Sequence, residues 1–258
     1  MVLTDLIVDF GEFILDGIDA LGKFILFLVN AVWHAVIPPY KPRLIIRQIR
    51  TIGAESFFLI VLVSAFTGMV LGLQGYNSLR RFGSEGALGT LVALTLVREL
   101  GPVLAALMIA ARAGSAMAAE LGSMQTTEQI DALTVMAINP VQYLVSPRLL
   151  AGIISFPLLT SVFDVIGIWG GYMIGVVLMG APGSSYLNGI ATYMTGRDIT
   201  TGLLKSLVFG VVVIWVCCYK GYHAKRMATG VSRATTEAVV LSSVLILAFD
   251  YFLTAVLF

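Results

Sequence analysis

Ionisable residues stand inside an otherwise apolar stretch that runs from Arg98 to Pro140, RELGPVLAALMIAARAGSAMAAELGSMQTTEQIDALTVMAINP. The charged pair Arg98-Glu99 opens this stretch, and Arg112 and Glu120 follow in a segment rich in Gly and Ala. An ionisable side chain deep in a bilayer costs on the order of 3 kcal/mol on insertion scales, so it should face a cavity or a partner. Two interpretations of the pair stay open. It makes a polar contact in a central cavity, with a headgroup or as a gate, or it is a structural pair near the outer interface with Arg98 snorkelling.

A short polar helix is predicted at the end of the same stretch, over residues 126–138. The run Thr126-Thr127-Glu128-Gln129 fits a capping box, with Thr126 as the N-cap and Gln129 three positions later. An apolar stripe follows, beginning with Ile130 and Leu133. Asn139-Pro140 is expected to end the helix.

The polar face of this helix carries Glu128, Gln129 and Asp131. An interfacial helix resting on lipid headgroups would normally carry Lys or Arg on that face. Because this face is acidic, a protein partner outside the membrane is the favoured interpretation. The loop helix would then act as a lever on the membrane segments around it.

Signatures of catalysis and of metal binding are absent from the sequence. It holds no G-x-x-x-x-G-K-[ST] run, no H-E-x-x-H and no G-x-S-x-G. His34 and His223 lie in separate interface regions, and the adjacent Cys217 and Cys218 lack metal-ligand spacing. No basic arm predicts nucleic-acid binding. We therefore expect a chain that is not an enzyme, binds no cofactor or metal, and takes its energy from elsewhere.

The elements that position these residues follow from the composition, which is 58% hydrophobic and only 12% charged over 258 residues. Soluble domains average about 25% charged residues, so an all-α polytopic membrane protein is predicted. Residues 1–36 carry acidic residues every three or four positions, which is typical of an amphipathic helix in the membrane interface. A basic linker follows to about residue 50, and residues 51–258 form the second predicted domain. Five segments there are long enough to cross the bilayer, at approximately 53–75, 87–111, 148–179, 203–221 and 237–257.

The distribution of Lys and Arg predicts the orientation. One side would hold Lys41, Arg43, Arg47, Arg50, Arg112, Arg148, Lys220, Lys225, Arg226 and Arg233, and the other Arg80, Arg81, Arg197 and Lys205. The richer side is cytoplasmic by the positive-inside rule. The N-terminus and the loop helix are thus expected in the cytoplasm of a bacterial plasma-membrane protein, with the C-terminus outside.

Small residues recur every fourth position within two predicted spans. Gly68 and Gly72 lie in the first span, and Gly167 and Gly171 in the third. Such faces let backbones approach closely. A homodimer seam and close packing within one subunit both remain open for them.

The central stretch resembles the signature of the MlaE family of ABC permeases. Further matches stand in the same order at GMVLGLQGY (Gly68 to Tyr76), SPRLLAGIISFPLLT (Ser146 to Thr160), GIWGG (Gly167 to Gly171) and VSRATTEAVV (Val231 to Val240). The similarity extends from about Pro42 to Phe258. It implies an N-terminal elbow helix, five spans per subunit and a homodimer.

The resemblance also implies partners and a cargo. A cytoplasmic ABC ATPase would bind ATP and Mg²⁺, a STAS-domain protein would accompany it, and a ring of MCE-domain subunits would stand on the periplasmic side. The assembly would move glycerophospholipid between the inner membrane and that ring, maintaining outer-membrane lipid asymmetry. A related importer of sterols or other hydrophobic compounds is the alternative, and a membrane enzyme acting on lipids is the less favoured one.

Site residues follow from the same resemblance. A lipid cavity at the dimer interface would be lined by positions matching Leu71, Tyr76, Leu79, Phe82, Arg98 and Glu99. The loop helix would be the coupling helix that docks on the ATPase. The residues expected to carry that coupling are Glu120, Thr126, Glu128, Gln129, Asp131 and Leu133.

Overall fold

The computed structural model describes the backbone of residues 2–36 and 42–257, and the side chains of residues 15, 17–19, 21–35 and 42–257. Every regular element of these residues is helical, which confirms the all-α prediction. The α-helices are α1 (Val2–Val36), α2 (Pro42–Ile52), α3 (Phe57–Arg80), α4 (Leu88–Thr95), α5 (Gly101–Ile109), α6 (Ser115–Thr126), α7 (Gln129–Val135), α8 (Ser146–Tyr172), α9 (Gly183–Tyr193), α10 (Gly196–Tyr222) and α11 (Ala228–Leu257). Short 3₁₀ turns, η1 (Ala54–Ser56) and η2 (Glu85–Ala87), precede α3 and α4. Four π-helical segments interrupt the long helices, namely η3 (Leu96–Leu100), η4 (Ala110–Gly114), η5 (Val141–Val145) and η6 (Met173–Leu178).

Six helical runs among the described residues are long and apolar enough to cross a membrane, so the chain is a multi-pass membrane protein. Five of them contain the predicted spans. The sixth, Gly17–Ala35, falls in the segment predicted to lie in the interface. The acidic face predicted for that segment comprises Asp5, Asp9, Glu12, Asp16 and Asp19. The side chains of the first four lie outside the described residues, and Asp19 is exposed and paired with Lys23.

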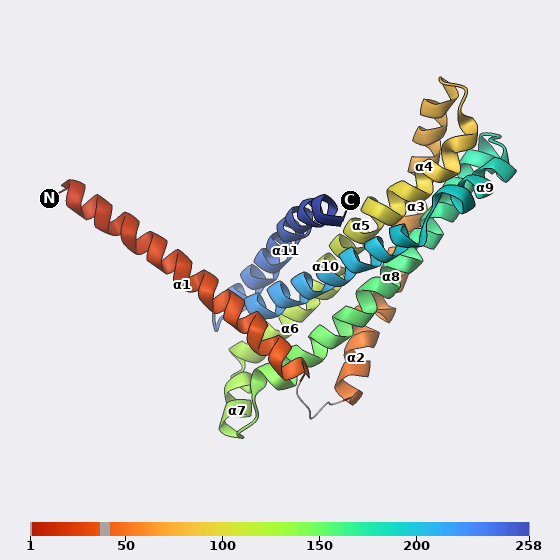
Figure 1. Cartoon of the computed structure of the whole chain (residues 1–258). Coiled ribbons are helices and arrows are strands. Elements are labelled where there is room, and N and C mark those ends of the chain that lie inside the picture. Colours follow the sequence, from red (N-terminus) through yellow and green to blue (C-terminus); the bar gives the residue numbers. More distant parts are fainter. Residues whose placement is uncertain (1, 37–41, 258) are drawn as a thin grey trace.

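Helix α10 is the centre of the bundle. In the most apolar stretch of α10, 67% is buried inside the protein. The corresponding values are 11% for α11 and 28% for the helical segment 42–80, which contains α3. It packs against α5, α6, α8 and α11, and Figure 1 shows it running through the middle of the bundle. Polar side chains that α10 carries are therefore removed from lipid and must find partners inside the protein.

The second half of α1 is attached to this bundle through aromatic contacts. The Phe24 ring stacks on Trp215 of α10 with 3.9 Å between ring centroids, and Trp215 Nε1 donates to the Phe24 carbonyl at 2.9 Å. Ser146 Oγ donates to the Ala31 carbonyl at 3.2 Å. The beginning of α1 projects away from the other helices (Figure 1).

Close backbone packing of α3 on α8 explains the repeated glycines. A Cβ on Gly68 would stand 1.9 Å from the Gly167 carbonyl oxygen, and one on Gly72 would stand 2.8 Å from the Gly171 carbonyl oxygen. These four glycines therefore pack closely within one subunit, as one of the two interpretations predicted. They let two helices of the same chain approach as small-xxx-small faces do.

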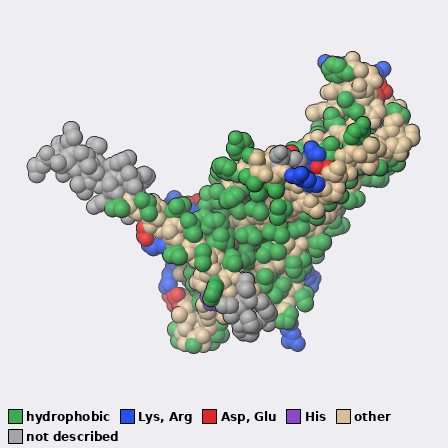
Figure 2. Space-filling view, viewed as in Figure 1, with side chains coloured by type: hydrophobic (Ala, Val, Ile, Leu, Met, Phe, Trp, Pro, Cys, Tyr) green, Lys and Arg blue, Asp and Glu red, His purple; other side chains and the backbone are tan. Residues whose placement is uncertain are grey.

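The two ends of the bundle differ in what they expose. α7 and α2 lie at one end, and α4 and α9 with their connecting turns lie at the other (Figure 1). Figure 2 shows hydrophobic side chains over most of the surface between these ends, with a small group of charged side chains interrupting it. This distribution is the one expected for a protein surrounded by lipid.

Replacing Gly68 with Ala should destabilise the bundle, because the new methyl group would collide with backbone that has no room to move. Overpacking of this kind costs about 1–3 kcal/mol, so the midpoint of thermal unfolding in detergent should fall by roughly 3–10 °C. Gly22→Ala is the control, since nothing lies within 4 Å of a Cβ there. Equal unfolding midpoints for the two variants would contradict the packing of α3 on α8.

Candidate functional site

The second span is built around the π-helical segment η3, which contains Arg98 and Glu99 and separates α4 from α5. Pro102 stands just after it. Because proline has no N–H, the Arg98 carbonyl four residues earlier loses its helical donor. Lys205 Nζ of α10 donates to this carbonyl at 3.0 Å instead. Single π-helical turns recur at functional sites, where a local fault in the helix frees backbone groups for other partners.

Lys205 is fully buried, and all three of its ammonium hydrogens are used. Besides the Arg98 carbonyl, it donates to Glu99 Oε2 and to Thr254 Oγ1, each at 2.7 Å. The Asp250 carboxylate makes a further ion pair at 3.1 Å. One buried cation thus connects η3, α10 and α11, and its desolvation is offset by two carboxylates and three hydrogen bonds.

Arg98 turns to a different partner. Its Nε and one terminal nitrogen contact Asp198 Oδ1 at 2.8 and 2.7 Å. Asp198 in turn accepts from the backbone N–H and hydroxyl of Thr195, so it caps α10 through a capping box. Its side chain is 3% exposed, whereas that of Arg98 is 37% exposed. One carboxylate thus fixes the guanidinium and leaves part of it accessible.

We call Arg98, Glu99, Asp198, Lys205 and Asp250 the charged cluster. Arg98 and Glu99 are not simply a local pair, because each bonds to α10. Lys205, which the charge distribution assigned to the side opposite the loop helix, is buried inside the bundle. With two cations and three carboxylates, the cluster balances most of its charge internally.

An apolar groove is formed by α3 and by the residue that follows Glu99 in the chain. It is lined by Phe66, Thr67, Val70 and Leu71 of α3 and by Leu100, the residue after Glu99, and has a volume of about 360 Å³. The partly exposed guanidinium and this groove offer complementary surfaces to an amphiphile with a negatively charged head and an apolar tail.

The residues predicted to line the lipid cavity do not all meet at this groove. Leu71 lines the groove. Arg98 and Glu99 precede Leu100, which also lines it, in the chain. Tyr76 is buried in the core, and Leu79 is half-buried. Phe82 lies beyond the end of α3 and is 80% exposed.

Sequence reasoning missed three members of the charged cluster and Thr254. The available signal was an ionisable residue inside an apolar helix, which holds for Lys205 and Asp250. Asp198 carried a different signal, because Thr195 and Asp198 have the spacing of a capping box.

At the opposite end, the loop helix α7 is shorter than predicted and begins differently. Thr126 belongs to the last turn of α6, where its hydroxyl donates to the Gly122 carbonyl. The predicted capping box at Thr126 is therefore wrong. Glu128, in a left-handed conformation with φ of 58°, precedes α7 without a side-chain cap. A left-handed residue can reverse the chain sharply, and the turn at Glu128 separates α6 from α7.

The end of α7 also departs from the prediction. The helix stops at Val135, and Ala137 follows with φ of 57°. Asn139 begins the next element rather than ending this one, because its Oδ1 accepts from the N–H of Val141 at 3.0 Å. Its Nδ2 lies 3.1 Å from Nε2 of His34, which joins the loop to the end of α1.

The acidic face of α7 has a partner within the same chain. Arg226, in the loop between α10 and α11, contacts Asp131 at 2.6 Å and Glu128 at 3.7 Å. The acidic residues therefore help hold α7 in place. Val135 and Met136, with exposed fractions of 87% and 61%, give the free tip an apolar character.

The remaining predicted coupling residues take three different positions. Gln129 is exposed, Leu133 is half-buried against the core, and Ile130 beside them is buried. Glu120 lies in α6, where it pairs with Arg148 of α8 at 2.7 Å. Since Arg148 is 3% exposed, Glu120 compensates a buried charge at the base of the loop.

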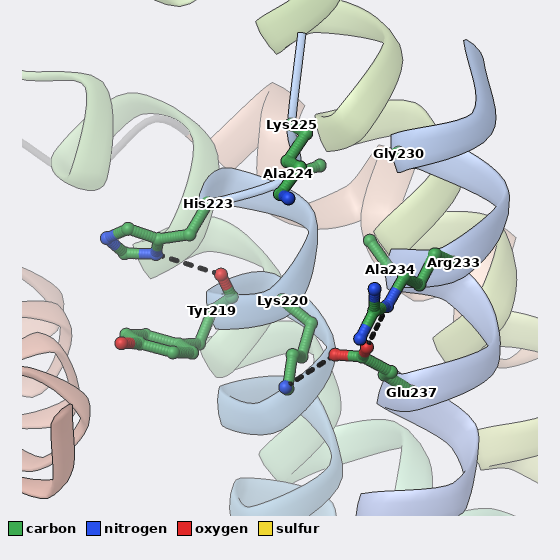
Figure 3. Close-up of a pocket in the computed structure, with 9 residues that line it drawn as sticks. All are labelled: Tyr219, Lys220, His223, Ala224, Lys225, Gly230, Arg233, Ala234 and Glu237. Atoms are coloured by element: carbon green, nitrogen blue, oxygen red, sulfur yellow. Dashed lines mark hydrogen bonds and ion pairs between the residues drawn. The ribbon is translucent and has the colours of Figure 1, made fainter. Parts of the chain in front are cut away.

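A recess of about 290 Å³ opens next to the Arg226 loop, between the end of α10 and the start of α11. Figure 3 shows Glu237 between two cations, accepting from Lys220 at 2.8 Å and from Arg233 at 2.7 Å. His223 Nδ1 lies 2.9 Å from the Tyr219 carbonyl. These contacts join α10 to α11 close to the loop that holds α7.

The comparison with protein families now decides the class of protein. The family described as "Permease MlaE" matches residues 45–256 of the chain. The chain belongs to the MlaE permease family. It is 40% identical to the intermembrane phospholipid transport system permease protein MlaE of Haemophilus influenzae, over 100% of this chain and 99% of that protein. It is 44% identical to a probable ABC transporter permease protein of Rickettsia felis, over 93% and 92% of the two chains.

A more distant MlaE relative is the chloroplastic protein TRIGALACTOSYLDIACYLGLYCEROL 1 of Arabidopsis thaliana, which is 33% identical over 83% of this chain and 61% of its own length. The region matched by the MlaE family includes the charged cluster, the groove and α7. The chain is thus an ABC transporter permease, and the site features described above all lie in its family-defining part.

Replacing Lys205 with Met should destabilise the protein strongly, because Glu99 and Asp250 would lose their shared cation. Breaking a buried ion pair from one side costs about 3–5 kcal/mol, so the unfolding midpoint in detergent should fall by roughly 10 °C or more. Adding Glu99→Gln should recover part of the loss. The exposed Lys225→Met is the control, and a similar effect of both lysine substitutions would contradict the role given to Lys205.

Proposed function

We propose that this chain is the permease subunit of an ATP-driven transporter that moves glycerophospholipid between the bacterial inner membrane and a periplasmic MCE-domain partner, and so maintains outer-membrane lipid asymmetry. The observation that carries the proposal is the guanidinium of Arg98, fixed by Asp198 and partly exposed on the same π-helical segment that supplies Leu100 to the apolar groove. A phosphate can accept charge-assisted hydrogen bonds from it while an acyl chain occupies the groove. The Haemophilus influenzae relative is the permease protein of an intermembrane phospholipid transport system, which supports the same cargo.

Two copies of the chain would enclose the lipid. The groove at Leu71 opens on the helical segment 42–80. Only 28% of the most apolar stretch of this segment is buried within one chain. Exposed Phe66 and Val70 stand on this face. A second copy would cover it and turn two open grooves into one cavity.

The energy would come from a cytoplasmic ABC ATPase that binds ATP and Mg²⁺, accompanied by a STAS-domain protein. The exposed tip of α7 supports this docking, because Val135 and Met136 are the apolar residues that a partner could bury. The ion pairs of Asp131 with Arg226 and of Glu120 with Arg148 would pass a displacement of α7 to α10 and α8. In this arrangement the N-terminus is cytoplasmic and the C-terminus periplasmic.

Arg98→Gln should lower lipid transfer in a complex reconstituted in vesicles, measured with fluorescent phosphatidylglycerol. Loss of a hydrogen bond to a charged group costs about 1.5–3 kcal/mol, which corresponds to roughly a tenfold to hundredfold decrease. Arg197→Gln is the matched control, because Arg197 is an exposed neighbour that contacts only the Leu257 carbonyl among described partners. Unchanged transfer by Arg98→Gln, or transfer of a sterol in place of phospholipid, would contradict the proposal.

The double variant Val135→Asp, Met136→Asp should lose the ATPase, because two charges would enter the apolar contact. Residues at the centre of an interface contribute about 2 kcal/mol or more, so retention of the ATPase in a detergent pull-down should fall by roughly thirtyfold. Phe82→Asp changes an equally exposed residue at the opposite end of the bundle and should retain it. Full retention by the α7 variant would exclude this tip as the docking site.

A further inference from the structure

A second apolar cavity lies away from the charged cluster, where α2 and the start of α3 meet α8. Its volume is about 560 Å³, and its wall is formed largely by Ile46, Ile49, Phe57, Leu158, Leu159 and Val162. Residues of α2 and α8 both contribute to it. Helix α2 lies at the end of the bundle that also carries α7 (Figure 1). Phe57 and Leu158 are 49% and 61% exposed, so the cavity opens to the surroundings of the protein.

The mouth of this cavity carries a cation. Arg50, at the end of α2, lines it and is exposed, and no described residue forms an ion pair or side-chain hydrogen bond with it. Arg43 and Arg47 are exposed on the same helix. Glu55, the acidic residue that follows in the chain, is already paired with Arg112. The α2 surface therefore has unbalanced positive charge next to an apolar hollow.

The cavity is also lined by a buried hydroxyl that has no hydrogen-bond partner among the described residues. Ser155 of α8 is 2% exposed, lines the cavity, and its Oγ has no hydrogen-bond partner among the described residues. A Cβ on Gly53 would stand 3.3 Å from this Oγ and 2.7 Å from the Ile49 carbonyl oxygen. Glycine at position 53 therefore leaves the space above the hydroxyl open. A buried polar group without a partner is destabilising, and an acceptor on a ligand would remove that penalty.

We propose that this cavity binds one anionic glycerophospholipid as a resident lipid. Its phosphate accepts hydrogen bonds from Arg50, one acyl chain fills the apolar hollow, and an ester carbonyl accepts from the Ser155 hydroxyl. A glycerophospholipid carries these groups in the order phosphate, ester carbonyl and acyl chain, from head to tail. A free phosphate would leave the apolar wall empty, and a sterol would leave Arg50 without an anion.

The resident lipid is distinct from the proposed cargo. Its cavity is formed by α2, η1, the first residue of α3 and α8, whereas the cargo groove is formed by the middle of α3 and by Leu100. Neither Arg98 nor Lys205 takes part. Bound there, the lipid would stabilise the contact of α2 with α8. The inference therefore does not depend on the transported substrate.

Photocrosslinking of the full chain in phosphatidylcholine vesicles tests this site. Benzoylphenylalanine replaces Phe57, an aromatic residue of the cavity wall, and trace radiolabelled phosphatidylglycerol or phosphatidylcholine is supplied. We expect labelling by phosphatidylglycerol to exceed that by phosphatidylcholine about fivefold or more, as a charge-assisted hydrogen bond allows. Arg50→Gln should abolish this difference, and Ser155→Ala should reduce labelling by both lipids, since both carry the ester carbonyl.

Arg43→Gln is the matched control, because Arg43 is exposed on α2 but does not line the cavity. It removes the same charge from the same helix but outside the cavity. The preference should therefore stay within about twofold of the parent. Equal labelling by the two lipids, an equal effect of Arg43→Gln, or crosslinking to a second copy of the chain would each overturn the proposal. Lipid transfer in the reconstituted complex, measured in parallel, separates failure of this site from failure of the transport function.

Discussion

The buried ammonium of Lys205 is the interaction on which the arrangement of the membrane core depends. It lies in the most deeply buried helix and satisfies a carbonyl that Pro102 leaves without a donor, two carboxylates and a hydroxyl. Because a lone charge in this place would be costly, the position of α10 determines where η3 and α11 must lie. The partial exposure of Arg98 accompanies that placement, since Asp198 on the same α10 fixes its guanidinium.

The two ends are linked by helices that meet through small residues and ion pairs as well as through the apolar core. Gly68 and Gly167 bring α3 against α8, so the groove at Leu71 and the base of the α7 loop share one support. Arg148 of α8 reaches Glu120, and Arg226 reaches α7 from the end of α10. A displacement of α7 would therefore act on the helices that carry the groove and the charged cluster.

Much of the fold could be predicted because membrane spans depend on length and apolarity, which a sequence states directly. The Arg98-Glu99 region could be found for the same reason, since charge among apolar residues is conspicuous. Their partners could not, because Lys205 and Asp250 lie over 100 residues away, and hydrophobic pattern does not specify which helix faces meet. The capping box at Thr126 was wrong because α6 extends to that residue, and its hydroxyl bonds backward to Gly122. The acidity of α7 suggested a protein partner, and its pairing with Arg226 of the same chain could not be read from the sequence.

The most direct test of the account is to locate bound phospholipid by cryo-electron microscopy of the permease in nanodiscs that contain phosphatidylglycerol. The account predicts a phosphate within hydrogen-bonding distance of the Arg98 guanidinium, with Asp198 still bound to its other side and an acyl chain along Leu71 and Leu100. A phosphate bound elsewhere, with a protein helix filling the groove and covering Arg98, would contradict it.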